Sequence, residues 1–148
     1  NKSKKIKGIV TLGSPIIFRK EKIKRYLFFP IIRRIKLFQK KKYDIDITEI
    51  NKRRTTYPMV ALRSIHQGLK IVILSKKCIK NIKTPILVMQ TENDKLTIEE
   101  SGEYIINHIK SKRKELITIP ESYHVFILDK YRKQVNKKIL GFIKKWKY

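Results

Sequence analysis

The sequence predicts an α/β protein built on a short parallel sheet. Three apolar runs rich in β-branched residues, at residues 8–12, 85–90 and 115–119, are typical of strands buried on both faces. Patterns with helical spacing lie between and after these runs. Strands that alternate with helices usually pair in parallel, so we expect helices on both faces of the sheet.

Three helices are expected from capping residues and apolar spacing. The first would begin at Pro58, which suits the first turn of a helix. Its apolar face would be Met59, Leu62, Ile65, Leu69, Val72 and Ile73. The second would begin at the capping-box sequence of residues 97–100, with Thr97 as the N-cap. The third would follow Asp129 as its cap. Its apolar face would be Tyr131, Val135, Ile139, Phe142, Ile143 and Trp146.

Residues 16–55 have a different character from the rest of the chain. They are basic and aromatic, and Pro30 divides an apolar stretch that runs from Tyr26 to Phe38. Because proline interrupts a helix, we expect two short helices or a helix and a loop here.

The net charge of +25, from 37 Lys and Arg against 12 Asp and Glu, favours contact with polyanions. Of the basic residues, 28 are Lys and 9 are Arg. Specific readers of phosphates and bases rely more on Arg, because its guanidinium forms bidentate hydrogen bonds. The sequence therefore indicates a composition bias rather than specific nucleic-acid binding, with weak contact of a membrane surface as a further possibility.

The single cysteine, Cys78, cannot form an internal disulfide and lies in no metal-ligand pattern. This usage fits a reducing compartment, so we expect a cytoplasmic location and an unreactive cysteine. No apolar run approaches the length of a membrane span, and no signal-peptide apolar region follows the basic amino terminus.

Asp94 and His124 follow the second and third expected strands within a few residues. Carboxyl ends of neighbouring parallel strands meet at one edge of a sheet, with the strands only about 5 Å apart. A carboxylate there would fix the imidazole tautomer through Nδ1–H and leave Nε2 to accept a proton from a serine hydroxyl. The alternatives are a solvated or capping aspartate and a structural histidine.

Other candidate residues carry weaker signals. His66 and His108 lie within helical patterns and are expected to serve packing or to lie on the surface. Ser14 is the most tempting nucleophile of the chain, but Leu12 and Ile16 stand where a Gly-x-Ser-x-Gly elbow has its two glycines. Pro15 follows it and cannot donate an amide hydrogen bond to an oxyanion, so Ser14 is not expected to be the nucleophile.

From Gly8 onward the sequence resembles the carboxyl-terminal half of α/β-hydrolases of the bacterial carboxylesterase and monoacylglycerol-lipase type. Residues 84–94, Thr-Pro-Ile-Leu-Val-Met-Gln-x-x-x-Asp, resemble the segment that bears the acid of that family. Residues 122–129, Ser-x-His-Val-x-x-Leu-Asp, resemble its histidine segment, and residues 9–15 resemble the strand before the lid.

The resemblance implies one partial α/β-hydrolase domain over residues 1–148: the last three parallel strands, flanking helices and a helical lid or cap insertion at residues 16–74. Asp94 and His124 would be the acid and base of a Ser-His-Asp triad. The serine and the oxyanion-hole amides would lie upstream of Asn1. The first strand would then leave one edge unpaired.

The activity implied is that of a carboxylesterase or lipase acting on a small-molecule carboxylic ester of medium or short acyl length, with no metal or organic cofactor. The chain alone is expected to be inactive, because it would lack the nucleophile. The alternative is an inactive remnant or a basic binding module for nucleic acid or anionic membrane. Thr91 and Tyr123 stand where the family usually has glycine, and the bulk of Tyr123 is expected to crowd the site.

Overall fold

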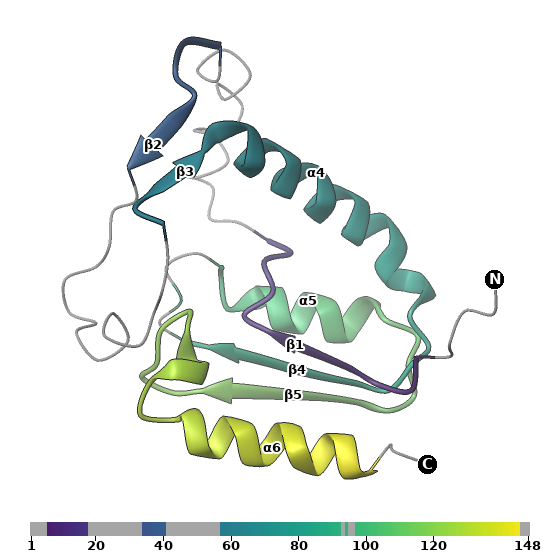
Figure 1. Ribbon diagram of the computed structural model, residues 1–148. Coiled ribbons are helices and arrows are strands. Elements are labelled where there is room, and N and C mark those ends of the chain that lie inside the picture. The colour runs from purple at the N-terminus through teal and green to yellow at the C-terminus, as the bar shows by residue number, and fades with distance from the viewer. Residues whose placement is uncertain (1–5, 18–33, 41–56, 93, 95–96, 146–148) are drawn as a thin grey trace.

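The computed structural model describes residues 6–17, 34–40, 57–92, 94 and 97–145. Its centre is a parallel sheet of strand order β1-β4-β5 (Figure 1). The strands are β1 (Ile9–Leu12), β4 (Ile86–Thr91) and β5 (Lys114–Ile119). Each begins and ends within one residue of the predicted run, and the predicted α/β fold class is confirmed.

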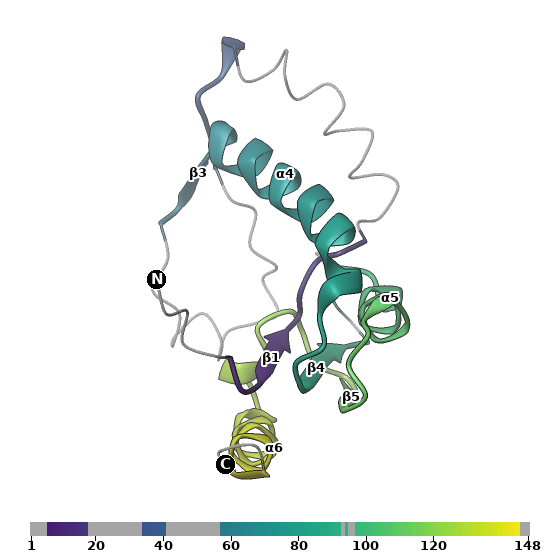
Figure 2. The ribbon, with the colours of Figure 1, turned by 90° about the vertical axis from the view of Figure 1, so that its right-hand side faces the viewer.

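The middle strand, β4, is buried along its whole length because strands pair with it on both sides and helices cover both faces. Figures 1 and 2 show α5 (Glu100–His108) on one face of the sheet and α6 (Arg132–Lys145) on the other. The core on the α5 side contains Ile16, Ile79, Ile86, Val88, Ile105 and Ile109. The core on the α6 side contains Leu87, Met89, Ile119, Phe126, Val135 and Phe142.

The start of the last helix agrees with the sequence. The Asp129 carboxylate accepts a hydrogen bond of 2.8 Å from the Tyr131 amide, and the Asp129 carbonyl accepts one from the amide of Arg132. Short 3-10 turns at Phe126–Leu128 and Ile79–Asn81 lead into neighbouring elements. Trp146, predicted on the apolar face of this helix, lies outside the described residues.

The predicted helix start at Pro58 is wrong. Residues Met59–Ala61 form strand β3, which pairs antiparallel with β2 (Phe38–Lys40), and α4 begins only afterwards, spanning Leu62–Cys78. The amide of Leu62 donates to the carbonyl of Leu37, so pairing with a distant segment overrides the local helical pattern. Met59 is therefore a strand residue.

The predicted capping box is also wrong. Helix α5 begins at Glu100, and its N-cap residue, Glu99, makes no side-chain capping bond. Thr97 uses its hydroxyl elsewhere, as described below.

The structure describes only part of the stretch at residues 16–55, because 18–33 and 41–56 lie outside it. The helices predicted around Pro30 are thus not among the described residues. Among the described residues we find no helix that could span a membrane.

A substitution at Gly102 tests the packing of α5 on the sheet. A Cβ at this position would overlap Gln90 Oε1 and would lie 2.8 Å from Leu116 Cδ1. Gln90 cannot easily move, because its amide group donates to the Glu99 carbonyl at 2.6 Å. We expect Gly102→Ala to lower the free energy of unfolding in urea by about 1–3 kcal/mol through overpacking.

Gly68→Ala is the matched control for this prediction. A Cβ at Gly68, inside α4, meets nothing within 4 Å. The control should keep the stability or raise it by up to about 1 kcal/mol, since alanine favours helix. Equal free energies of unfolding for the two variants would contradict the close packing of Gly102.

Candidate active site

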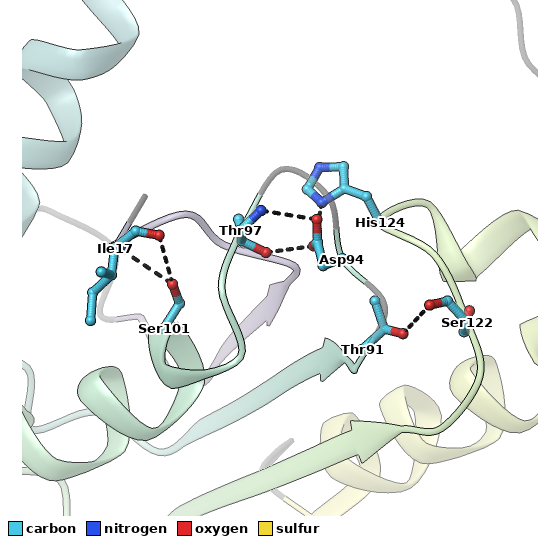
Figure 3. A network of polar contacts seen from close by, with 7 residues as sticks. All are labelled: Ile17, Thr91, Asp94, Thr97, Ser101, Ser122 and His124. Atoms are coloured by element: carbon cyan, nitrogen blue, oxygen red, sulfur yellow. Dashed lines mark hydrogen bonds and ion pairs between the residues drawn. The ribbon is translucent and has the colours of Figure 1, made fainter. Parts of the chain in front are cut away.

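The fold brings Asp94 and His124 together at the carboxyl edge of the sheet, beyond the ends of β4 and β5. His124 Nδ1 lies 2.7 Å from Asp94 Oδ2 (Figure 3). The Asp94 side chain is 2% exposed, whereas the His124 side chain is 32% exposed. A buried carboxylate thus holds one nitrogen of an imidazole that remains accessible.

Thr97 supplies two further hydrogen bonds to the Asp94 carboxylate. Its amide donates to Oδ1 at 2.9 Å, and its hydroxyl donates to Oδ2 at 2.5 Å. The Thr97 hydroxyl, which was expected to cap α5, therefore donates to Asp94 instead. The Asp-x-x-Thr spacing at residues 94–97 is a local side-chain-to-backbone pattern, and it was the sequence signal for this role.

These bonds control the charge of Asp94. Burial acts to raise the pKa of this carboxyl, but the hydrogen bonds from His124 and Thr97 outweigh it and leave the pKa below its ordinary value of 3.8. Asp94 is therefore ionised at neutral pH. An ionised carboxylate at Nδ1 favours the tautomer that carries a proton on that nitrogen.

The loop that carries His124 is fixed at Ser122, which is fully buried. The Thr91 hydroxyl donates to the Ser122 carbonyl, and the Ser122 hydroxyl donates to the Asp129 carboxylate. The end of β4 and the start of α6 are thereby tied to one residue of the loop. Thr91, which stands where glycine is usual, therefore anchors the histidine loop. Because Thr91 and Ser122 are 31 positions apart, no local sequence signal pointed to this contact.

Tyr123 does not prevent the pair from forming. The bond between Asp94 and His124 is made with a half-buried tyrosine in place. Among the described residues, Glu121 is the one non-glycine residue with a positive φ, at 47°. The backbone at Tyr123 therefore needs no glycine.

His108 and Cys78 lie apart from the pair. His108 stacks on Tyr104 with ring centroids 3.8 Å apart, and its Nδ1 lies 2.8 Å from the Tyr104 carbonyl, which fits the packing role expected for it. Cys78 is an exposed thiol at the end of α4. Within the described ranges, no group of three His, Cys, Asp or Glu side chains is placed to hold a metal ion.

Replacement of Thr97 tests the hydrogen bond from its hydroxyl to the Asp94 carboxylate. The folded pKa of Asp94 lies below its ordinary value, so the ionised carboxylate stabilises the fold at any pH above the ordinary pKa. This stabilisation is lost as the pH falls through the lowered pKa. Thr97→Val removes the hydroxyl donor. We expect it to lower the free energy of unfolding at pH 7 by about 1.5–3 kcal/mol, the usual contribution of a hydrogen bond to a charged group.

Urea unfolding at a series of pH values makes the measurement. The deficit of Thr97→Val should shrink as the pH falls from about 4 through the lowered pKa of wild-type Asp94, because protonation removes the charge that the Thr97 hydroxyl stabilises. Thr97→Ser is the control, because it keeps the hydroxyl and should keep most of the stability. A deficit independent of pH would show that Thr97 acts through packing and not through the carboxylate.

Comparison with known proteins places the chain in a family. A family model described as serine aminopeptidase, S33, matches residues 34–131. A carboxylesterase of Bacillus subtilis (strain 168) is 29% identical over 140 residues, which are 95% of this chain and 55% of that protein.

Two solved structures have the same fold. A lipolytic enzyme from the metagenome-derived LipS and LipT pair superposes with a TM-score of 0.80 at 21% identity, over 95% of this chain and 56% of its own. The monoacylglycerol lipase of Paleococcus ferrophilus gives 0.77 at 15% identity, over 93% of this chain and 58% of its own. The chain thus spans about half the length of the relatives it matches. Since the family model covers most of the sequence, the chain belongs to the serine aminopeptidase S33 family, a family of esterase- and lipase-type α/β-hydrolases.

Proposed function

We propose that Asp94 and His124 are the acid and base of a Ser-His-Asp triad that hydrolyses small-molecule carboxylic esters. The observation that carries the proposal is the 2.7 Å contact between the buried Asp94 carboxylate and His124 Nδ1. The serine and the oxyanion-hole amides would come from a part of the hydrolase outside these 148 residues.

The reaction follows from the two nitrogens of His124. Asp94 keeps the proton on Nδ1 and stabilises the imidazolium that forms later. The other ring nitrogen points away from Asp94 and from the sheet (Figure 3). It takes the hydroxyl proton of the serine as the serine oxygen bonds to the ester carbonyl, and it returns that proton to the departing alcohol. Water then hydrolyses the acyl-enzyme by the same proton transfers.

The proposal includes a lid or cap insertion at residues 16–74. Two of its described parts, the β2–β3 pair and most of α4, lie outside the parallel sheet (Figures 1 and 2). They expose large apolar side chains, among them Phe38 at 51%, Ile71 at 63% and Leu74 at 59%. Exposed apolar surface of this kind suits contact with an acyl chain or a lipid interface.

The test of the triad uses the complete hydrolase and a p-nitrophenyl ester of short acyl length. We expect His124→Ala and Asp94→Asn to lower kcat/KM by about a thousandfold or more, because triad members act as a unit. His108→Ala is the matched control, since His108 packs on Tyr104 away from the pair, and it should keep the activity. Unchanged hydrolysis in either His124→Ala or Asp94→Asn would refute the proposal.

The same proposal predicts that the 148 residues alone neither hydrolyse the ester nor react with a fluorophosphonate probe. Ser14 is the residue to check, because it follows the glycine that lies against His124. Labelling of the isolated chain that disappears in Ser14→Ala would place the nucleophile inside the chain and contradict this part of the proposal.

One observation favours a second candidate function, the binding of polyanions. A hollow of about 670 Å³ lies between α6 and the first residues of β4 and β5, at the sheet end opposite to Asp94 and His124. Its walls include one carboxylate, that of Glu115, and a larger set of basic residues: Lys112, Arg113, Lys114, Lys137, Lys138 and Lys145. Such a concentration of positive charge attracts polyanions through release of their counterions.

Binding to heparin at increasing salt tests this candidate. We expect the double substitution Lys137→Glu with Lys138→Glu to weaken binding about tenfold or more at low salt and to reduce the salt dependence. Lys76→Glu with Lys77→Glu, on α4, makes the same change of charge away from the hollow and serves as the control. Equal weakening by both pairs would mean that overall charge, rather than the hollow, attracts the polyanion.

A further inference from the structure

The turn after β1 lies directly against the imidazole of His124. Gly13 has a φ of +55°, and a Cβ at this position would lie 3.2 Å from both Cε1 and Nδ1 of His124. The Gly13 amide donates to the Met89 carbonyl at 2.8 Å, which continues the pairing of β1 with β4 by one residue. The ring edge that includes Nδ1 therefore faces a glycine whose backbone is fixed to the central strand, with too little room for a side chain between them.

The far end of this turn is held by Ser101 in the first turn of α5. The Ser101 hydroxyl donates to the Ile17 carbonyl at 3.1 Å and accepts from the Ile17 amide at 3.2 Å (Figure 3). Ser101 is 2% exposed, so its hydroxyl is shielded from water. Residues 13–17 are thus fixed at one end by β4 and at the other by α5.

These contacts connect the Gly13 turn, the acid–base pair and helix α5 in a closed series of interactions. Gly13 lies against His124, His124 bonds to Asp94, and Asp94 accepts two bonds from Thr97, just before α5. Helix α5 carries Ser101, which returns to the Gly13 turn through Ile17. We propose that residues 13–17 form a wall that positions the imidazole, with Gly13 and Ser101 as positioning residues.

A wall beside the imidazole is needed because one hydrogen bond does not fix the orientation of the ring. The torsion that turns an imidazole about its Cβ–Cγ bond has broad minima, so the bond to Asp94 leaves the ring free to tilt. His124 is 32% exposed, so part of the ring faces solvent. Contact with Gly13 limits the tilt and keeps Nδ1 aligned with the carboxylate. The importance of the wall for catalysis rests on the proposed function, whereas the geometry of the wall is independent of that function.

The test is an NMR measurement on the 148-residue chain labelled with ¹⁵N in its histidines. In the wild type, the Nδ1 proton of His124 should give a downfield signal that exchanges slowly with water. Gly13→Asn adds a Cβ beside the ring, while asparagine tolerates the left-handed φ of the turn. We expect this variant to increase the exchange rate of that proton about tenfold. Weakening one hydrogen bond should raise the population of the open state, from which the proton exchanges, by about that factor.

Two further variants keep the result decisive. Gly141→Ala adds a methyl group in α6 where nothing lies within 4 Å, and it should leave the signal unchanged. Ser101→Ala removes the two bonds to Ile17 without backbone strain, and it should increase the exchange rate by a smaller factor. If Gly13→Asn does not fold, the exchange rate in Ser101→Ala decides alone. Wild-type exchange in Ser101→Ala, or in a folded Gly13→Asn, would overturn the proposal.

Activity of the complete hydrolase separates this inference from the proposed function. Faster exchange in the Gly13→Asn chain, with no ester hydrolysis by the complete wild-type protein, would reject the function and support the wall. Hydrolysis whose kcat is unaffected by Gly13→Asn, together with unchanged proton exchange, would support the function and reject the wall. A fall in kcat with little change in KM supports both, because the wall holds the base and not the ester.

Discussion

The burial of β4 is the constraint on which the rest of the structure depends. Every residue of this strand is buried, and it is the only strand of the described sheet with neighbours on both sides. Its end presents Thr91, which anchors the histidine loop, and the turn that follows presents Asp94. The Met89 carbonyl also fixes Gly13. One buried strand thus sets the positions of the acid, of the loop that carries the base, and of the turn against the imidazole.

A buried carboxylate is costly unless its oxygens are satisfied, and the surroundings of Asp94 meet that requirement. Thr97 donates twice and His124 once, so the charge is stabilised by groups that also restrict its orientation. The same bonds that lower the pKa of Asp94 therefore align it with the imidazole. Stability and alignment come from a single set of contacts.

The sequence predicted the elements whose signals are local. The three strands are short apolar runs between turn residues, and Asp129 lies directly before its helix. The meeting of Asp94 and His124 was predictable because parallel strands bring their carboxyl ends together. The start of α4 was not predictable, since Met59–Ala61 is drawn into a strand by Phe38–Lys40. The contacts of Thr91 and of Gly13 escaped prediction for the same reason, because their partners are distant in sequence.

The pairing of β1 with β4 has a consequence for the order in which the protein folds. The whole of residues 13–85 separates these strands, whereas β4, α5, β5 and α6 follow one another closely. Closing a long loop costs entropy before its contacts form, so the contiguous unit from β4 to α6 should assemble first and β1 should join it later. Asp94 and His124 both belong to the early unit, whereas Gly13 arrives with β1. We therefore expect the acid and base to come together during folding before residues 13–17 lie against the imidazole.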